Sequence, residues 1–179
     1  MKPHVLAIIL ILAGLFLLVF GVIVLTVLLS ILGVIDFSPR NQPVVLAVDA
    51  LKSAYLNPYL LLDSYQAVTF AKGTAIARGA ITERAQIGID EEQLCLSLGD
   101  LSGSPNFEGT TQMITYTGSA QMDAKFSVLC APGSDLLSLV GEGKDYPDIK
   151  AEWASGCECV TDPALAEKTC CLIALRYVT

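Results

Sequence analysis

The sequence predicts an α+β protein in which a long N-terminal hydrophobic helix is followed by a mostly antiparallel, β-rich and disulfide-bonded head domain. Three observations predict this fold class. Residues 5–35 contain no charged side chain. Several later segments alternate apolar and polar residues with the period of two that indicates half-buried strands. All six cysteines lie in the second half of the chain. The expected organisation is therefore a transmembrane or filament-core helix over 1–35, a linker over 36–43 and an extracytoplasmic α+β domain over 44–179.

The hydrophobic run over 5–35 is longer than a bilayer requires. At 1.5 Å per residue, a helix of this length spans about 46 Å, whereas the hydrocarbon core of a bilayer is about 30 Å thick. A cleaved signal peptide has an apolar core of only about 7–15 residues and a small-x-small cleavage site, and Ile35-Asp36-Phe37-Ser38-Pro39 offers no such site. The run predicts an uncleaved anchor in the lipid bilayer, with its excess length covered by protein.

Small residues recur every seven positions within this run, at Ala7, Gly14 and Gly21. Seven residues make about two helical turns, so the three positions fall on nearly one face. Small residues let membrane helices approach closely. We therefore expect self-association through this helix-packing seam. The alternative interpretation is that glycine is simply frequent in membrane helices.

The charge of the chain excludes one class of partner. The net charge is −7, and residues 36–179 carry 10 basic and 18 acidic side chains. Nucleic-acid binding requires clustered Lys and Arg that neutralise phosphates, and docking on anionic lipid has the same requirement. The sequence therefore predicts no nucleic-acid partner.

Beyond the linker, the pattern predicts one helix and then mainly strands. Pro43 suits the first turn of a helix over 44–56, whose apolar residues Val44, Val45, Val48, Leu51 and Tyr55 fit one face. A short helical or irregular piece is expected over 59–65, and Ser134 could cap a short helix over 135–140. Strands are expected over 85–89, 94–98, 113–117, 126–128 and 171–178.

The six cysteines are Cys95, Cys130, Cys157, Cys159, Cys170 and Cys171. An even number in a translocated domain favours disulfide bonds. On strands, Cys157 and Cys159 would share a face, whereas Cys170 and Cys171 would point to opposite faces. One of the last pair can then close the loop 160–169, and the other should reach elsewhere, for example Cys95 or Cys130. The alternatives are free thiols or thiolate ligation of Zn or Cu(I), although the usual spacing of structural zinc sites is absent.

Motifs for catalysis are missing. His4 is the only histidine of the chain and precedes the hydrophobic run, so the domain cannot build a Ser-His-Asp, Cys-His or H-E-x-x-H site. The sequence Gly141-Glu142-Gly143-Lys144 is too short for a phosphate-binding loop. We therefore expect no enzymatic activity and no cofactor.

The overall layout and the segment Leu29-Ser30-Ile31-Leu32-Gly33-Val34-Ile35-Asp36-Phe37-Ser38-Pro39 resemble type IV pilin-like proteins, particularly those of archaea. In that family a hydrophobic N-terminal helix lies in the membrane before assembly and in a filament core afterwards, and a β-rich head follows. A basic-Gly processing site and a Glu near the start of the helix, common in pilins, are absent here. The resemblance implies a non-enzymatic structural protein of the cell surface, with its N-terminus cytoplasmic before assembly. The alternatives are a single-pass protein with an extracytoplasmic ligand- or partner-binding domain and, third, a redox enzyme using C-x-C.

Overall fold

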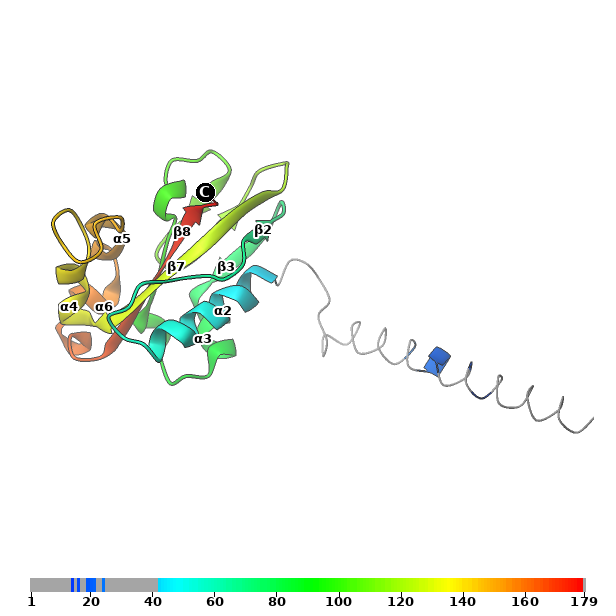
Figure 1. Cartoon of the computed structure of the whole chain (residues 1–179), viewed down its shortest axis with the longest axis horizontal. Helices are drawn as coiled ribbons and strands as arrows, with labels where there is room; N and C mark the ends of the chain where they lie inside the picture. The colour runs from blue at the N-terminus through cyan, green and yellow to red at the C-terminus, as the bar shows by residue number, and fades with distance from the viewer. Residues whose placement is uncertain (1–13, 15, 17–18, 22–23, 25–41, 179) are drawn as a thin grey trace, which may run out of the picture. The chain divides into compact units, whose positions relative to one another are not determined.

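The computed structural model describes residues 42–178 and, in the N-terminal segment, residues 14, 16, 19–21 and 24 (Figure 1). The chain divides into two compact units, Met1–Pro39 and Arg40–Thr179. The six described residues of the first unit are helical and exposed. The rest of that unit lies outside the described residues, and so does most of the predicted linker.

The predicted long hydrophobic helix requires a correction. Among the described residues, no helix combines the length and the apolar character needed to cross a membrane. The described structure is α+β with a mixed sheet and disulfide bonds, without a long apolar N-terminal helix. The prediction of a long apolar N-terminal helix was therefore wrong for the described part of the chain, because an absence of charge alone does not fix where a helix begins and ends.

The second unit begins with the helix α2 (Gln42–Tyr55). Pro43 stands in its first turn, where the missing N–H breaks no helical hydrogen bond. The buried residues recur at helical spacing, as expected for an amphipathic helix: they are Pro43, Val44, Ala47, Val48, Ala50, Leu51 and Ala54. The helix over 44–56 is thus confirmed, but Val45, predicted on the apolar face, is 42% exposed.

The central sheet is built on two long antiparallel strands, β7 (Met122–Pro132) and β8 (Thr169–Tyr177), paired from Ala124↔Tyr177 to Pro132↔Thr169. Two short strands, β1 (Leu62–Asp63) and β2 (Val68–Phe70), pair with the other edge of β7. The strand β4 (Leu94–Ser97) pairs with β8 in parallel. This parallel pair makes the sheet mixed, although the other pairings are antiparallel as predicted.

A second, three-stranded antiparallel sheet has the order β3-β6-β5. Its strands are β3 (Ala75–Ala77), β6 (Met113–Tyr116) and β5 (Phe107–Gly109). Aromatic rings join it to the central sheet, because Phe70 of β2 lies 5.2 Å from Phe107 and 6.1 Å from Tyr116 between ring centroids. The Phe70–Phe107 pair is edge-to-face, an arrangement that adds stability beyond the apolar area that it buries.

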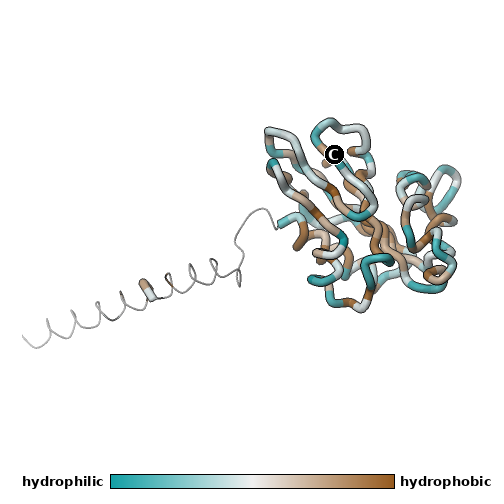
Figure 2. Tube along the Cα trace, turned by 180° about the vertical axis from the view of Figure 1, so that it is seen from behind, coloured by the Kyte–Doolittle hydropathy of each residue, from teal (hydrophilic) through white to brown (hydrophobic). Residues whose placement is uncertain are grey.

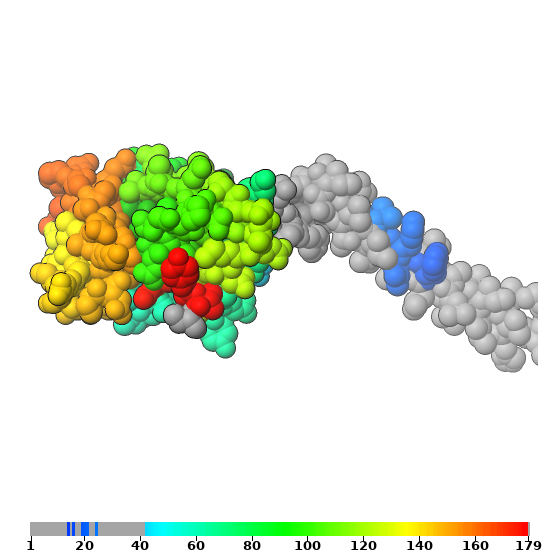
Figure 3. Space-filling view, turned by 90° about the horizontal axis from the view of Figure 1, so that it is seen from above, coloured from blue at the N-terminus to red at the C-terminus, as the bar shows by residue number. Residues whose placement is uncertain are grey.

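Helices cover the central sheet on both faces (Figure 1). On one face lie α2 and α3 (Arg78–Ala85); on the other lie α4 (Gly133–Leu139), α5 (Ala151–Ser155) and α6 (Glu158–Thr161). The domain also contains three short 3-10 helices, at Glu91–Gln93, Gly99–Leu101 and Pro163–Leu165. The segments that follow α4 gather at one end of the domain, yellow to orange in Figure 3.

The alternation of β8 divides the interior into two cores. Cys171, Ile173 and Leu175 belong to the first core, which contains α2, α3 and the second sheet. Cys170, Leu172 and Ala174 belong to the second core, with α4, α5 and α6. Hydrophobic segments accordingly converge on the strands in Figure 2, whereas the loops are largely hydrophilic. A strand buried on both faces reads as a nearly continuous apolar run, which is the sequence of β8.

Two local predictions differ from the structure. The segment 85–89 is the end of α3 and a loop, because Gln86 takes a left-handed conformation (φ 53°) and donates its backbone N–H to the carbonyl of Thr82. The short helix predicted over 135–140 is α4, which starts two residues earlier, and Ser134 does not cap it. Three alternating apolar residues were too short a pattern to separate a strand from a helix end.

Candidate functional site

The cysteines form the most distinctive cluster of the described domain. Two disulfide bonds are present, Cys95–Cys157 and Cys130–Cys171. Cys159 and Cys170 are buried free thiols. The prediction of disulfide bonds is therefore confirmed for four of the six candidate residues.

The two disulfides make different kinds of link, one within the sheet and one between the sheet and the helical layer. Cys130 and Cys171 are direct register partners on β7 and β8, and both belong to the first core. Cys95 stands on β4, whereas Cys157 is the N-cap residue of α6, so their bond ties the edge of the sheet to the helical layer. All four of these residues are at most 1% exposed. The sheet is thus covalently linked both within itself and to one covering layer.

The sequence predicted the positions of some of these cysteines correctly and of others incorrectly. Cys170 and Cys171 do point to opposite cores, as predicted from the alternation of a strand. Cys157 and Cys159 share one core, but they stand at the start and inside a helix, and the strand assumed for them was wrong. Because four sulfurs are consumed by disulfides, the C-x-C and C-C pairs are not available together as thiolate ligands for a metal.

The two free thiols contact each other between α6 and β8. Cys170 donates its thiol hydrogen to the carbonyl oxygen of Cys159, with the Sγ and oxygen atoms 3.3 Å apart. A hydrogen bond between the two thiols, followed by burial, raises the pKa of Cys159 above its ordinary value. The same hydrogen bond lowers the pKa of Cys170. The shared hydrogen bond thus moves the two pKa values in opposite directions and makes Cys170 the more acidic thiol of the pair.

An ionic cluster lies beside the cysteines. The guanidinium of Arg78 is 3.0 Å from a carboxylate oxygen of Glu158 and 3.7 Å from one of Glu91, and the Arg78 side chain is only 11% exposed. Glu158 follows Cys157 directly in α6. Arg78 thus joins the start of α3, on one face of the sheet, to the helical layer on the other.

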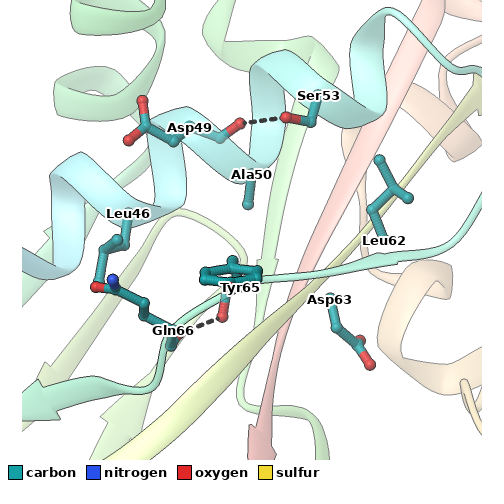
Figure 4. A pocket seen from close by; sticks show the side chains of 9 residues that line it. Leu46, Asp49, Ala50, Ser53, Leu62, Asp63, Tyr65 and Gln66 are labelled. Carbon is teal, nitrogen blue, oxygen red and sulfur yellow. Dashed lines mark hydrogen bonds between the residues drawn. The ribbon is translucent and has the colours of Figure 1, made fainter.

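A groove of about 500 Å³ runs between α2 and the segment that joins β1 to β2 (Figure 4). Helix α2 contributes Leu46, Asp49, Ala50 and Ser53, and the other wall is formed by residues 62–66. This wall is fixed because Ser64 donates its backbone N–H to the carbonyl of Phe126, at 2.6 Å, and its Oγ accepts the N–H of Phe126, at 3.1 Å. The hydroxyl of Ser127 also donates to Asp63.

Tyr65 is the residue that sequence reasoning missed at this groove. Its side chain is 99% exposed, while its neighbour Ser64 is 7% exposed. A fully exposed tyrosine carries a large apolar ring into water, and such residues are enriched at protein interfaces. No signal in the sequence could have found it, because the exposure follows from the bend that Ser64 imposes between two short strands.

A second exposed tyrosine connects distant parts of the fold. Tyr59 has a positive φ of 66° and donates its hydroxyl to Asp135 of α4, at 2.9 Å. This hydrogen bond to the carboxylate raises the pKa of Tyr59 above its ordinary value. The backbone carbonyl of Tyr59 also accepts a hydrogen bond from the hydroxyl of Tyr146. The turn before β1 is therefore held to the helical layer.

The structure describes two of the three seam residues. Gly14 and Gly21 are helical and exposed, and beyond the adjoining residues of the helix no described atom lies within 4 Å of the position that a Cβ would take. Ala7 lies outside the described residues. The seam thus stays a prediction.

No protein-family model, curated protein or solved structure matches the chain. The resemblance to pilin-like proteins therefore also stays a prediction.

Proposed function

We propose that the chain is a non-enzymatic structural protein of the cell surface, resembling a pilin-like filament subunit, with its α+β domain outside the cytoplasm. The observation that carries the proposal is the pair of buried disulfides, Cys95–Cys157 and Cys130–Cys171. Disulfides persist in oxidising compartments and are rare in the cytosol. Cross-links both within the sheet and between sheet and helices suit a domain that must stay folded outside the cell.

The position of α2 supports a structural role. It is the first element that the structure describes after the uncharged segment 5–35, and its inner side is buried against the central sheet. A load applied through the N-terminal segment would therefore act on the core of the domain. We propose that this segment associates with the lipid bilayer and with copies of itself.

Electron microscopy of purified native protein tests the assembly, with the variant Gly14→Leu/Gly21→Leu as the perturbation. Leu is more apolar than Gly, so the segment keeps its affinity for lipid, but its bulk should separate neighbouring copies. We expect fewer filaments and weaker crosslinking. The matched control is Val19→Leu, which adds bulk about 140–160° away around a helix. Equal association of all three proteins would refute the seam.

A partner-binding domain is the second candidate, favoured by the open groove at Tyr65. A photoreactive amino acid placed at position 65 of the full chain separates the two readings. Adducts between two copies of the chain would support assembly. Adducts of one copy with a protein of different mass would instead support partner binding.

A further inference from the structure

The two free cysteines each lie next to a bridged one. Cys159 is two residues from Cys157, and Cys170 directly precedes Cys171. A thiolate attacks a neighbouring disulfide by exchange, so an unpaired thiol at these positions endangers the correct pairing. Pairing the two free thiols with each other would remove this hazard.

The fold brings the two sulfurs together. Both cysteines are 0% exposed and belong to the second core. The thiol of Cys170 lies 3.3 Å from the carbonyl oxygen of Cys159. A disulfide requires two cysteines whose backbones lie close together, and the contact between the Cys170 sulfur and the backbone of Cys159 shows that proximity.

The segment between the two cysteines is fastened onto the start of α4. Gly133 donates its backbone N–H to Lys168, at 3.0 Å, and Ser134 donates to Ala166, at 2.9 Å. Gly133 packs so closely that an added Cβ would overlap the carbonyl oxygen of Cys159 and lie 3.2 Å from the sulfur of Cys170. The absence of a side chain at Gly133 therefore leaves room for the two cysteines to meet.

We propose that Cys159 and Cys170 form a third disulfide bond in the mature protein, which closes the loop 160–169 over the start of α4. The oxidant is another disulfide, RS–SR, either a small molecule or a disulfide-exchanging protein. The Cys170 thiolate attacks it, and one RS⁻ leaves. The Cys159 sulfur then attacks the Cys170 sulfur of the mixed disulfide, and the second RS⁻ leaves. The two thiol protons end on the two RS⁻ groups, so two thiols are oxidised and one disulfide is reduced.

Burial sets the order of these events. Because neither sulfur is exposed in the folded domain, the exchange takes place before the loop 160–169 docks on α4. The bond would then be protected from reductants in the folded protein.

Tryptic mapping of the full chain, purified without reductant and with free thiols blocked under denaturing conditions, tests the proposal. Cleavage after Lys and Arg places the six cysteines on four peptides, 85–125, 126–144, 151–168 and 169–176. The two disulfides of the structure alone would give two separate pairs, 85–125 with 151–168 and 126–144 with 169–176. The third bond would join all four peptides into one species.

We expect the four-peptide species in the parent protein, and a gain of six hydrogens in intact mass on reduction. The control Cys159→Ala/Cys170→Ala should give the two separate pairs and a gain of four hydrogens. Two pairs in the parent, with blocked Cys159 and Cys170, would overturn this proposal alone. Six blocked cysteines in the parent would overturn it together with the extracytoplasmic location.

Discussion

Removing one disulfide at a time measures how far the domain depends on covalent linkage. The perturbations are Cys95→Ala/Cys157→Ala and Cys130→Ala/Cys171→Ala, whose bonds join residues separated by 62 and 41 positions in the sequence. On the chain-entropy model, either bond reduces the entropy of the unfolded state by an amount worth about 4 kcal/mol at 25 °C. The free energy of unfolding should fall by about that much in each variant, out of a typical total of about 5–15 kcal/mol.

Urea denaturation provides the assay. Trp153 is the only tryptophan of the chain and is 6% exposed, so its fluorescence reports the unfolding of the second core. Both variants remove two buried sulfurs, so their packing costs are matched and their midpoints should be similar. Reduction of the parent should lower its midpoint below that of either variant. A loss of less than about 1 kcal/mol in both variants would refute the reasoning, because loop closure alone predicts more.

Three other perturbations test the packing between layers. Arg78→Met removes a mostly buried guanidinium from two carboxylates that are 59% and 47% exposed, and it should lower the free energy of unfolding by about 1 kcal/mol. Lys150→Met, at an exposed ion pair, should cost less than about 0.5 kcal/mol in the same urea titration. Gly99→Ala should cost more than Gly103→Ala, since both have positive φ but only the Cβ at Gly99 would overlap a carbonyl oxygen of β8; equal midpoints would contradict this. The raised pKa of Tyr59 means that the folded state favours the protonated phenol. The stability that Tyr59 contributes is therefore complete below the ordinary tyrosine pKa and is lost as the pH rises through the pKa of Tyr59 in the folded protein. Curves of unfolding free energy against pH, measured from pH 8 to 11 for the parent and for Tyr59→Phe, should converge at the alkaline end.

The sequence predicted the elements whose patterns are long. Helix α2, with a proline in its first turn and apolar residues at helical spacing, was located to within two residues at its start and one at its end. The strands β4, β6 and β8 were predicted within one or two residues at each end. The extent of β7 was underestimated, because only Phe126 and Val128 of its 11 residues alternate clearly with polar neighbours.

The remaining features depend on long-range contacts that local patterns do not encode. The parallel pairing of β4 with β8 joins residues more than 70 positions apart. The groove beside α2 exists because Ser64 bonds to Phe126, 62 positions away. Arg78 was not singled out, because its two glutamate partners are distant in sequence and charged residues are usually solvated. The presence of disulfide bonds was predictable from the number of cysteines, whereas the choice of which cysteines pair depends on the fold.

The adjacent cysteines of β8 explain why this strand is central to the domain. Successive residues of a strand point to opposite faces, so Cys171 bonds to Cys130 in the first core while Cys170 meets Cys159 in the second. Without a bond at Cys170, the loop 160–169 is held to α4 by packing and by backbone hydrogen bonds. With that bond, one strand would carry covalent links into both cores, and the helical layer would be tied to the sheet at β4 and at β8. Separation of α6 from the sheet would then require reduction of both bonds.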